Sequence, residues 1–167
     1  IEGSCSLLLL NKDGIYADPR SARLGLRRLH NGEPEPIKTN LEKADNEAYT
    51  HHRIKSGVPQ GPKEIDSSSA FPLEYRLDQF NGIDFQKGCF IGQEVTSRAY
   101  RKGSLRKQIF AVTVQGSAEP GHIITSNDKT VGEVRAVSQN DALALIRLDS
   151  LGGDLSSPHA TLKIREL

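Results

Sequence analysis

The second half of the chain alternates apolar and polar residues with a period of two. This spacing is typical of β-strands that turn one face to a core and the other to solvent. The alternating apolar positions are Phe110, Val112, Val114, Val134, Ala136, Ala160, Leu162 and Ile164. Turn-forming residues separate the runs, at Pro120-Gly121, Asn127-Asp128, Gln139–Asp141 and Gly152-Gly153. We therefore predict a small antiparallel β-barrel or sandwich over residues 104–167.

One run in this half, Ala142–Leu148, is almost continuously apolar. A strand that is buried on both faces has this pattern. We expect it to lie at the centre of the sheet.

The first half of the chain mixes strand and helix patterns. The apolar runs Ser6–Leu10 and Ile15–Ala17 flank the turn residues Asn11–Gly14, which predicts a hairpin, and Leu24–Leu29 predicts a further short strand. Apolar residues at helical spacing predict helices over Asn40–Ser56, with Asn40 as the N-cap, and Leu73–Phe80.

These elements predict an α+β fold in two parts. A hairpin and two helices leave apolar faces uncovered, so the N-terminal part looks incomplete. We place a boundary near Tyr100–Ser104, with residues 1–100 as one unit and residues 104–167 as the barrel.

The composition narrows the classes of protein that fit. The 22 basic and 21 acidic side chains among 167 residues give a net charge of +1, which excludes a strongly cationic nucleic-acid coat protein. No apolar run approaches 18 residues, so no membrane span is expected. Cys5 and Cys89 form no CxxC pair, which is typical of a reducing compartment. The chain contains no Met, so we expect a fragment or a processed chain.

The densest cluster of reactive side chains lies in residues 81–94. Lys87 stands two residues before Cys89, and a nearby cation favours the thiolate, which is the nucleophilic and metal-binding form of cysteine. Gln93 and Glu94 add an amide and a carboxylate. The alternative is a structural loop that happens to contain a free cysteine. The residue types alone leave both interpretations open.

The octapeptide Lys87-Gly88-Cys89-Phe90-Ile91-Gly92-Gln93-Glu94 resembles the KGC[FY]xGQE signature of the YgfZ family, which includes the Iba57/Caf17-like iron–sulfur assembly factors. The resemblance extends from Ala17 to about Lys107. It includes the stretches Asp18-Pro19-Arg20 with Leu24–Arg27, Arg53-Ile54 with Gly57-Val58-Pro59, Phe71–Glu74 with Leu77-Asp78, and Val95–Lys107.

The resemblance implies a fold and a cofactor. The family shares the fold of the glycine-cleavage aminomethyltransferase, in which a folate-binding body precedes a six-stranded barrel. The chain would then lack the N-terminal part of the body. The implied cofactor is tetrahydrofolate, with Glu74 at the position that holds the pterin, because a carboxylate can accept two N–H bonds from an aminopterin edge. The alternative for Glu74 is an ordinary exposed glutamate.

The resemblance also assigns roles in the octapeptide. Cys89, assisted by Lys87, is the functional cysteine, either as a reactive thiolate or as a transient ligand of an iron–sulfur cluster. Gln93, Glu94 and Arg98 are assigned to the cofactor site. Arg98 could pair either with the glutamate tail of folate or with Glu94.

Three functions follow from these features. The first is a folate-dependent factor that matures iron–sulfur proteins, with assembly proteins or client enzymes as partners; whether it turns over as a transferase-like enzyme stays open. The second is an aminomethyltransferase of the glycine-cleavage type, and the third is an RNA-binding protein linked to tRNA modification. We favour the first, located in the cytoplasm of a bacterium or in the mitochondrial matrix of a eukaryote.

Two other clusters are given lesser roles. The basic run Arg98, Arg101, Lys102, Arg106 and Lys107 could bind nucleic acid, a phosphate or an acidic partner. A solvated linker is the preferred interpretation, and nucleic acid is not expected as a direct ligand. His51 and His52 point about 100° apart on a helix, so they are not expected to share a metal.

Overall fold

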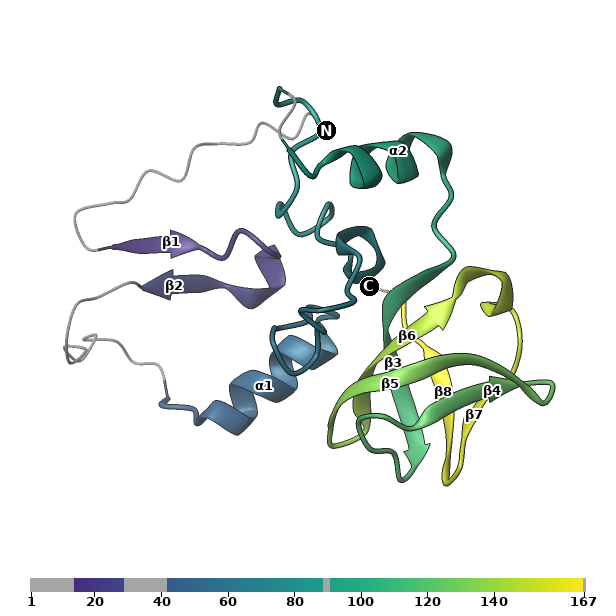
Figure 1. Ribbon diagram of the computed structural model, residues 1–167. Coiled ribbons are helices and arrows are strands. Elements are labelled where there is room, and N and C mark those ends of the chain that lie inside the picture. Colours follow the sequence, from purple (N-terminus) through teal and green to yellow (C-terminus); the bar gives the residue numbers. More distant parts are fainter. Residues whose placement is uncertain (1–13, 29–41, 89–90, 167) are drawn as a thin grey trace.

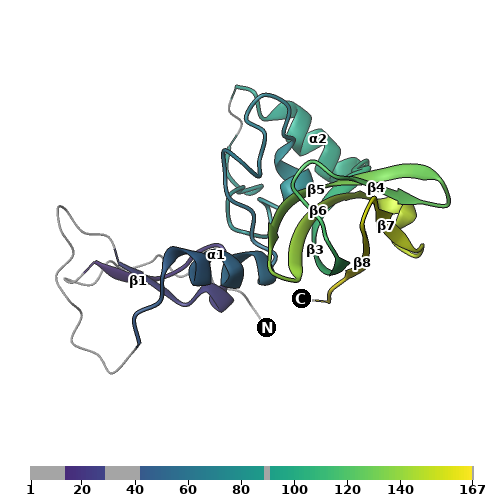
Figure 2. The same cartoon turned by 90° about the horizontal axis from the view of Figure 1, so that it is seen from below.

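The computed structural model describes residues 14–28, 42–88 and 91–166. They form an N-terminal part of short helices and a two-stranded sheet, followed by a barrel (Figure 1). Figure 2 shows the hairpin projecting away from the barrel, with α1 lying between the two. The predicted strand Ser6–Leu10, the two cysteines and Phe90 lie outside the described residues.

Six antiparallel strands close the barrel in the order β3-β6-β5-β4-β7-β8. Their bounds are Lys107–Gly116 (β3), Ile123–Ser126 (β4), Lys129–Ser138 (β5), Asp141–Arg147 (β6), Leu155–Ser157 (β7) and Ala160–Ile164 (β8). The barrel closes where the second half of β3 pairs with β8, up to Gly116 and Ala160. Gly116 has φ +112, and a side chain there would collide with the carbonyl of His159. The predicted C-terminal antiparallel barrel and the α+β fold class are confirmed.

Strand β6 is buried on both faces, as its continuous apolar run predicted. Ala142, Ala144 and Ile146 point into the barrel, where they join the core of the other strands. The intervening Leu143 and Leu145 point outward and pack in a second core. Because both sets are buried, no polar residue interrupts the run before Arg147.

The outer core joins the barrel to α1 (Asn46–Lys55). Ile54 of this helix is 1% exposed and packs with Leu143, Leu145 and Ile109 of the barrel. The predicted helix start at Asn40 was wrong. The helix begins at Asn46 because the Asp45 side chain accepts a hydrogen bond from the backbone N–H of Ala48 at 2.8 Å.

The other elements of the N-terminal part are short. Strands β1 (Ile15–Ala17) and β2 (Leu26–Arg28) pair antiparallel around the 3₁₀ turn η1 (Ala22–Leu24). The predicted helix Leu73–Phe80 is wrong. Residues Pro72–Tyr75 form the 3₁₀ turn η2, which ends because Arg76 takes a left-handed conformation (φ 58°).

A helix that the sequence analysis did not predict, α2, covers Glu94–Lys102. Gly103, with φ +57, ends it four residues before β3 begins. Three of the five residues of the basic run therefore belong to this helix, and Lys107 belongs to β3.

Candidate functional site

The octapeptide leads directly into α2. Gln93 occupies the N-cap position, and its backbone carbonyl accepts a hydrogen bond from Ser97 N–H at 3.0 Å. Gly92 has φ +87, a conformation that side chains disfavour. Lys87 is exposed, and Ile91 is fully exposed. The described part of the octapeptide is thus a surface segment, consistent with a role that needs access from outside.

An aromatic stack holds this segment against α2. The rings of Phe85 and Tyr100 lie parallel, with centroids 3.8 Å apart and an interplanar angle of 16°. Because the centroids are this close, the two rings overlap almost face to face. Phe85 comes two residues before Lys87, so the stack fixes where the octapeptide begins.

Two predicted cofactor residues that lie on α2, Glu94 and Arg98, pair with each other. Arg98 Nη2 donates a hydrogen bond to Glu94 Oε1, one helical turn away. Both side chains are exposed, Glu94 by 78% and Arg98 by 63%. The structure thus shows the contact with Glu94, and the alternative contact with the glutamate tail of folate stays a prediction. The role of both residues in a folate site stays a prediction.

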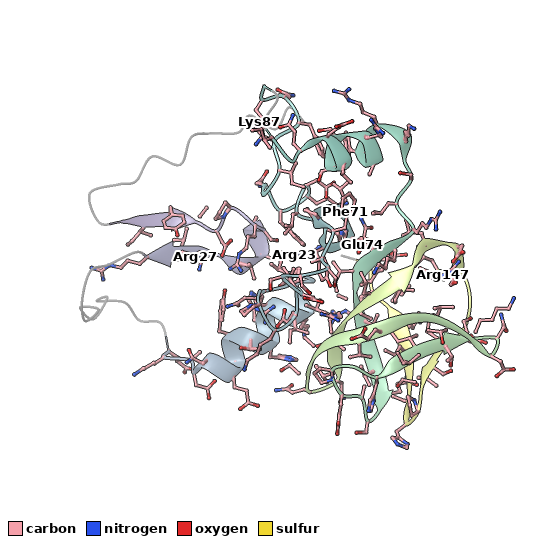
Figure 3. All side chains as sticks on the ribbon, viewed as in Figure 1. Arg23, Arg27, Phe71, Glu74, Lys87 and Arg147 are labelled. Carbon is pink, nitrogen blue, oxygen red and sulfur yellow. The ribbon has the colours of Figure 1, made fainter. Side chains whose placement is uncertain are left out.

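Glu74 lies apart from the octapeptide, where η2 meets the barrel. Figure 3 shows Lys87 on the loop before α2 and Glu74 beside the barrel. The Glu74 side chain is 14% exposed, and its Oε2 lies 3.4 Å from Nζ of Lys107. Glu74 lines a pocket with Lys107 and Arg147, whereas Glu94 and Arg98 line a different one. The structure therefore does not bring all the predicted cofactor residues into one pocket.

The two histidines make separate contacts. His51 Nδ1 lies 3.3 Å from the carbonyl of Ser138, and His52 Nε2 lies 2.7 Å from the carbonyl of Arg23. Among the described residues, no three His, Cys, Asp or Glu side chains are grouped to hold a metal ion.

Comparisons with known proteins decide the family. Residues 106–166 match the family described as the CAF17 C-terminal beta-barrel domain. The chain is 36% identical over 147 residues to the human protein named iron-sulfur cluster assembly factor IBA57, mitochondrial, and 34% identical over 148 residues to its Mus musculus counterpart. Each match covers 84% of this chain and 41% of the relative. The chain belongs to the Iba57/Caf17-like family.

A Dictyostelium discoideum homologue of the same name is 40% identical over 111 residues, which are 63% of this chain and 27% of the relative. The Iba57/Caf17-like membership inferred from the octapeptide is confirmed. This Iba57/Caf17-like chain spans about 41% of the length of the two mammalian relatives. None of the described helices is long and apolar enough to cross a membrane.

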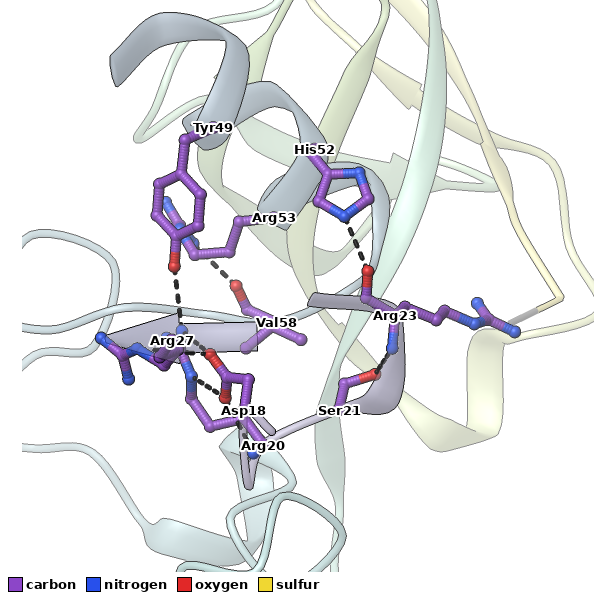
Figure 4. A network of polar contacts seen from close by, with 9 residues as sticks. All are labelled: Asp18, Arg20, Ser21, Arg23, Arg27, Tyr49, His52, Arg53 and Val58. Carbon is purple, nitrogen blue, oxygen red and sulfur yellow. Dashed lines mark hydrogen bonds and ion pairs between the residues drawn. The ribbon is translucent and has the colours of Figure 1, made fainter. Parts of the chain in front are cut away.

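The stretch Asp18–Arg20, which carried part of the family resemblance, forms a polar network with α1 (Figure 4). Asp18 accepts hydrogen bonds from Arg20 Nε at 3.0 Å and Nη2 at 2.7 Å, and Arg20 Nη2 also donates to the Tyr49 hydroxyl at 2.9 Å. Asp18 is 4% exposed, and the hydrogen bond from Arg20 holds the pKa of its carboxyl below the usual range. In this Iba57/Caf17-like chain, the network fastens the β1–β2 hairpin to α1.

The sequence analysis missed Arg147 as a pocket residue. Its position at the end of the buried run was visible, but its alignment with Lys107 depends on the strand register of the barrel. No sequence spacing indicates that register.

Proposed function

We propose that this chain contributes to the assembly of iron–sulfur clusters on other proteins, in the mitochondrial matrix. The observation that carries the proposal is the match over 84% of the chain to relatives named mitochondrial iron-sulfur cluster assembly factors. The match includes the segment that contains the KGCFIGQE octapeptide. The cluster is cargo in this proposal, and assembly proteins or client enzymes are the partners.

Cys89 is the residue that we propose to act on the cluster. A thiolate binds iron, and Lys87 two residues away favours the thiolate. A single cysteine supplies one ligand, whereas a cluster commonly has four. Partner proteins would supply the others, so a cluster held here should be labile.

Tetrahydrofolate is the proposed cofactor, with Glu74 as its pterin ligand. Glu74 fits this role because its carboxylate lines an open pocket, and Lys107 is its one charged neighbour within 4 Å among the described residues. One carboxylate oxygen is therefore available to accept an N–H bond from a pterin. When bound, folate would supply one-carbon chemistry, and Glu74 would orient its pterin ring.

Replacement of Cys89 tests the proposed function. In a chimera, this chain replaces the segment of the human relative that it matches. The chimera is then expressed in cells that lack the human relative. We expect the chimera to restore the activity of mitochondrial iron–sulfur enzymes and Cys89→Ser to abolish the restoration, because serine is nearly isosteric but is a poor iron ligand. Cys5→Ser is the matched control and should restore as well as the parent chimera.

The same cells separate the alternatives. Full restoration by Cys89→Ser would overturn the cysteine mechanism. Rescue of growth that depends on glycine cleavage, without rescue of iron–sulfur enzymes, would favour the aminomethyltransferase instead.

A further inference from the structure

An open pocket beside the β1–β2 hairpin, the hairpin pocket, is formed by stretches to which the proposed function gives no role. Three arginines of the hairpin line it, Arg20, Arg27 and Arg28, and so does Tyr49 of α1. Its volume is about 370 Å³, near the lower end of the range for small-molecule sites. It shares no residue with the pocket that Glu74 lines, and Figure 3 shows Arg27 on the hairpin, apart from Glu74.

The hairpin pocket carries more positive than negative charge. Asp18 is the one acidic side chain among the described residues that line it, so the three arginines leave an excess of two positive charges. Arg20 already satisfies the Asp18 carboxylate with hydrogen bonds to both oxygens. Nε of Arg27 lies 3.6 Å from Asp18 Oδ2, which is beyond hydrogen-bonding range. Because the Arg27 side chain is 46% exposed, its charge reaches solvent at the pocket.

Two partners hold Arg20 in place within this pocket. Its Nε and Nη2 atoms donate to Asp18, and Nη2 also donates to the hydroxyl of Tyr49. The hydrogen bond from Arg20 lowers the pKa of the buried Asp18 carboxyl, so this carboxyl stays ionised at neutral pH. Among the described residues, Nη1 of Arg20 has no acceptor, and the Tyr49 hydroxyl still has its own proton to donate. The pocket therefore presents N–H and O–H donors whose positions are already fixed.

A phosphate monoester matches this set of donors better than a carboxylate does. A phosphate monoester has three terminal oxygens and a charge of about −1.5 to −2 at pH 7, which balances the excess positive charge of the pocket. The guanidinium group of arginine can donate two parallel hydrogen bonds to phosphate oxygens. A carboxylate has two oxygens and a single negative charge, so it would leave one arginine charge without a counter-ion.

We propose that the hairpin pocket binds the phosphate group of a phosphate monoester, with Arg20, Arg27 and the Tyr49 hydroxyl as its donors. The site is independent of the role in cluster assembly and of the folate site, because it involves neither Cys89 nor Glu74.

NMR titration of the chain with phenyl phosphate tests the pocket, and benzoate serves as the matched carboxylate. We expect saturable amide shifts in residues 18–28 with phenyl phosphate, and binding of benzoate that is at least tenfold weaker. Arg27→Gln should weaken phenyl phosphate binding at least tenfold, and Tyr49→Phe should weaken it severalfold; unchanged barrel amides show that each variant folds. Arg23→Gln is the control and should leave binding unchanged, because Arg23 is an exposed arginine of the same hairpin that does not line the pocket. Figure 4 shows its side chain directed away from Arg27.

Vesicles of phosphatidylcholine that contain phosphatidic acid identify the source of the phosphate. Sedimentation of the chain with these vesicles that is lost in Arg27→Gln but kept in Arg23→Gln assigns the phosphate to a lipid headgroup. Saturable binding of phenyl phosphate without such sedimentation assigns it to a soluble ester. The proposal would be overturned by the absence of saturable shifts at millimolar phenyl phosphate, by equal binding of benzoate, or by equal weakening in Arg27→Gln and Arg23→Gln.

Discussion

At the scale of single residues, two Arg–Glu ion pairs of this chain differ mainly in burial. Arg53 donates to both carboxylate oxygens of Glu64, with one contact at 2.7 Å, and the side chains are 3% and 12% exposed. The backbone N–H of Gln60 donates to Glu64 at 2.7 Å as well. Glu94 and Arg98, by contrast, pair in solvent.

Glu64→Gln is expected to lower the free energy of unfolding by about 3–5 kcal/mol, because it leaves the Arg53 charge buried without a counter-ion. Glu94→Gln removes the same charge from the exposed pair and should cost less than about 1 kcal/mol. Urea denaturation of the two variants measures the difference. Equal losses would mean that Arg53 reaches solvent when its partner is removed.

The sequence indicated one member of the buried pair but not the other. Arg53 stood in a stretch that resembles the family, whereas Glu64 lies in the following loop, where nothing distinguishes a buried carboxylate from an exposed one. The same limit applies to the pocket that Glu74 lines. Glu74 was singled out as a site residue, but its neighbour Lys107 was assigned to a solvated linker, because the contact between them arises only in the folded barrel.

At the scale of elements, the sequence predicted those whose apolar pattern matches their burial. The strand β6 was recognised because both of its faces are buried. The helix α2 was missed because none of its residues is fully buried, and the apolar Val95 and Tyr100 are 68% and 53% exposed. When the apolar side chains of a helix do not pack against the rest of the described structure, their spacing in the sequence gives little indication that the helix is there.

The start of α1 gives a prediction at this scale. Asp45→Ala is expected to destabilise the chain by about 1 kcal/mol, because it removes the side-chain acceptor for the N–H of Ala48. Asn40→Ala serves as the control and should change stability by no more than about 0.5 kcal/mol. Thermal denaturation followed by circular dichroism measures both. A larger effect at Asn40 would support the earlier helix start that the sequence suggested.

At the scale of the whole molecule, the barrel and the N-terminal part share one core. Ile54 of α1 and Tyr75 of η2 pack with the outward-facing residues of β3, β5 and β6. The barrel is therefore not an independently packed unit, because one of its outer faces would be apolar and exposed without α1.

Ile54→Ala should cost about 2–5 kcal/mol and should lower the protection of barrel amides in β6 together with those of α1. Hydrogen exchange with mass spectrometry resolves the two regions, and a single unfolding transition in urea is expected. Ile123→Ala is the control, because this β4 side chain is 46% exposed and surface changes cost about 0.5 kcal/mol or less. Loss of protection in α1 alone would show that the two parts unfold separately.

The closure of the barrel by β8 has a consequence for the order of events during synthesis. Strand β3 must wait for a partner that follows 44 to 52 residues later, since Gly116 pairs with Ala160 and Val112 with Ile164. Such distant pairing is slow, because the intervening chain has to be ordered first. On the ribosome the barrel would stay open until β8 has emerged. The apolar residues that line the barrel interior, such as Val112 and Ala144, would stay uncovered on that side until then, which makes this interval the one in which a chaperone matters most.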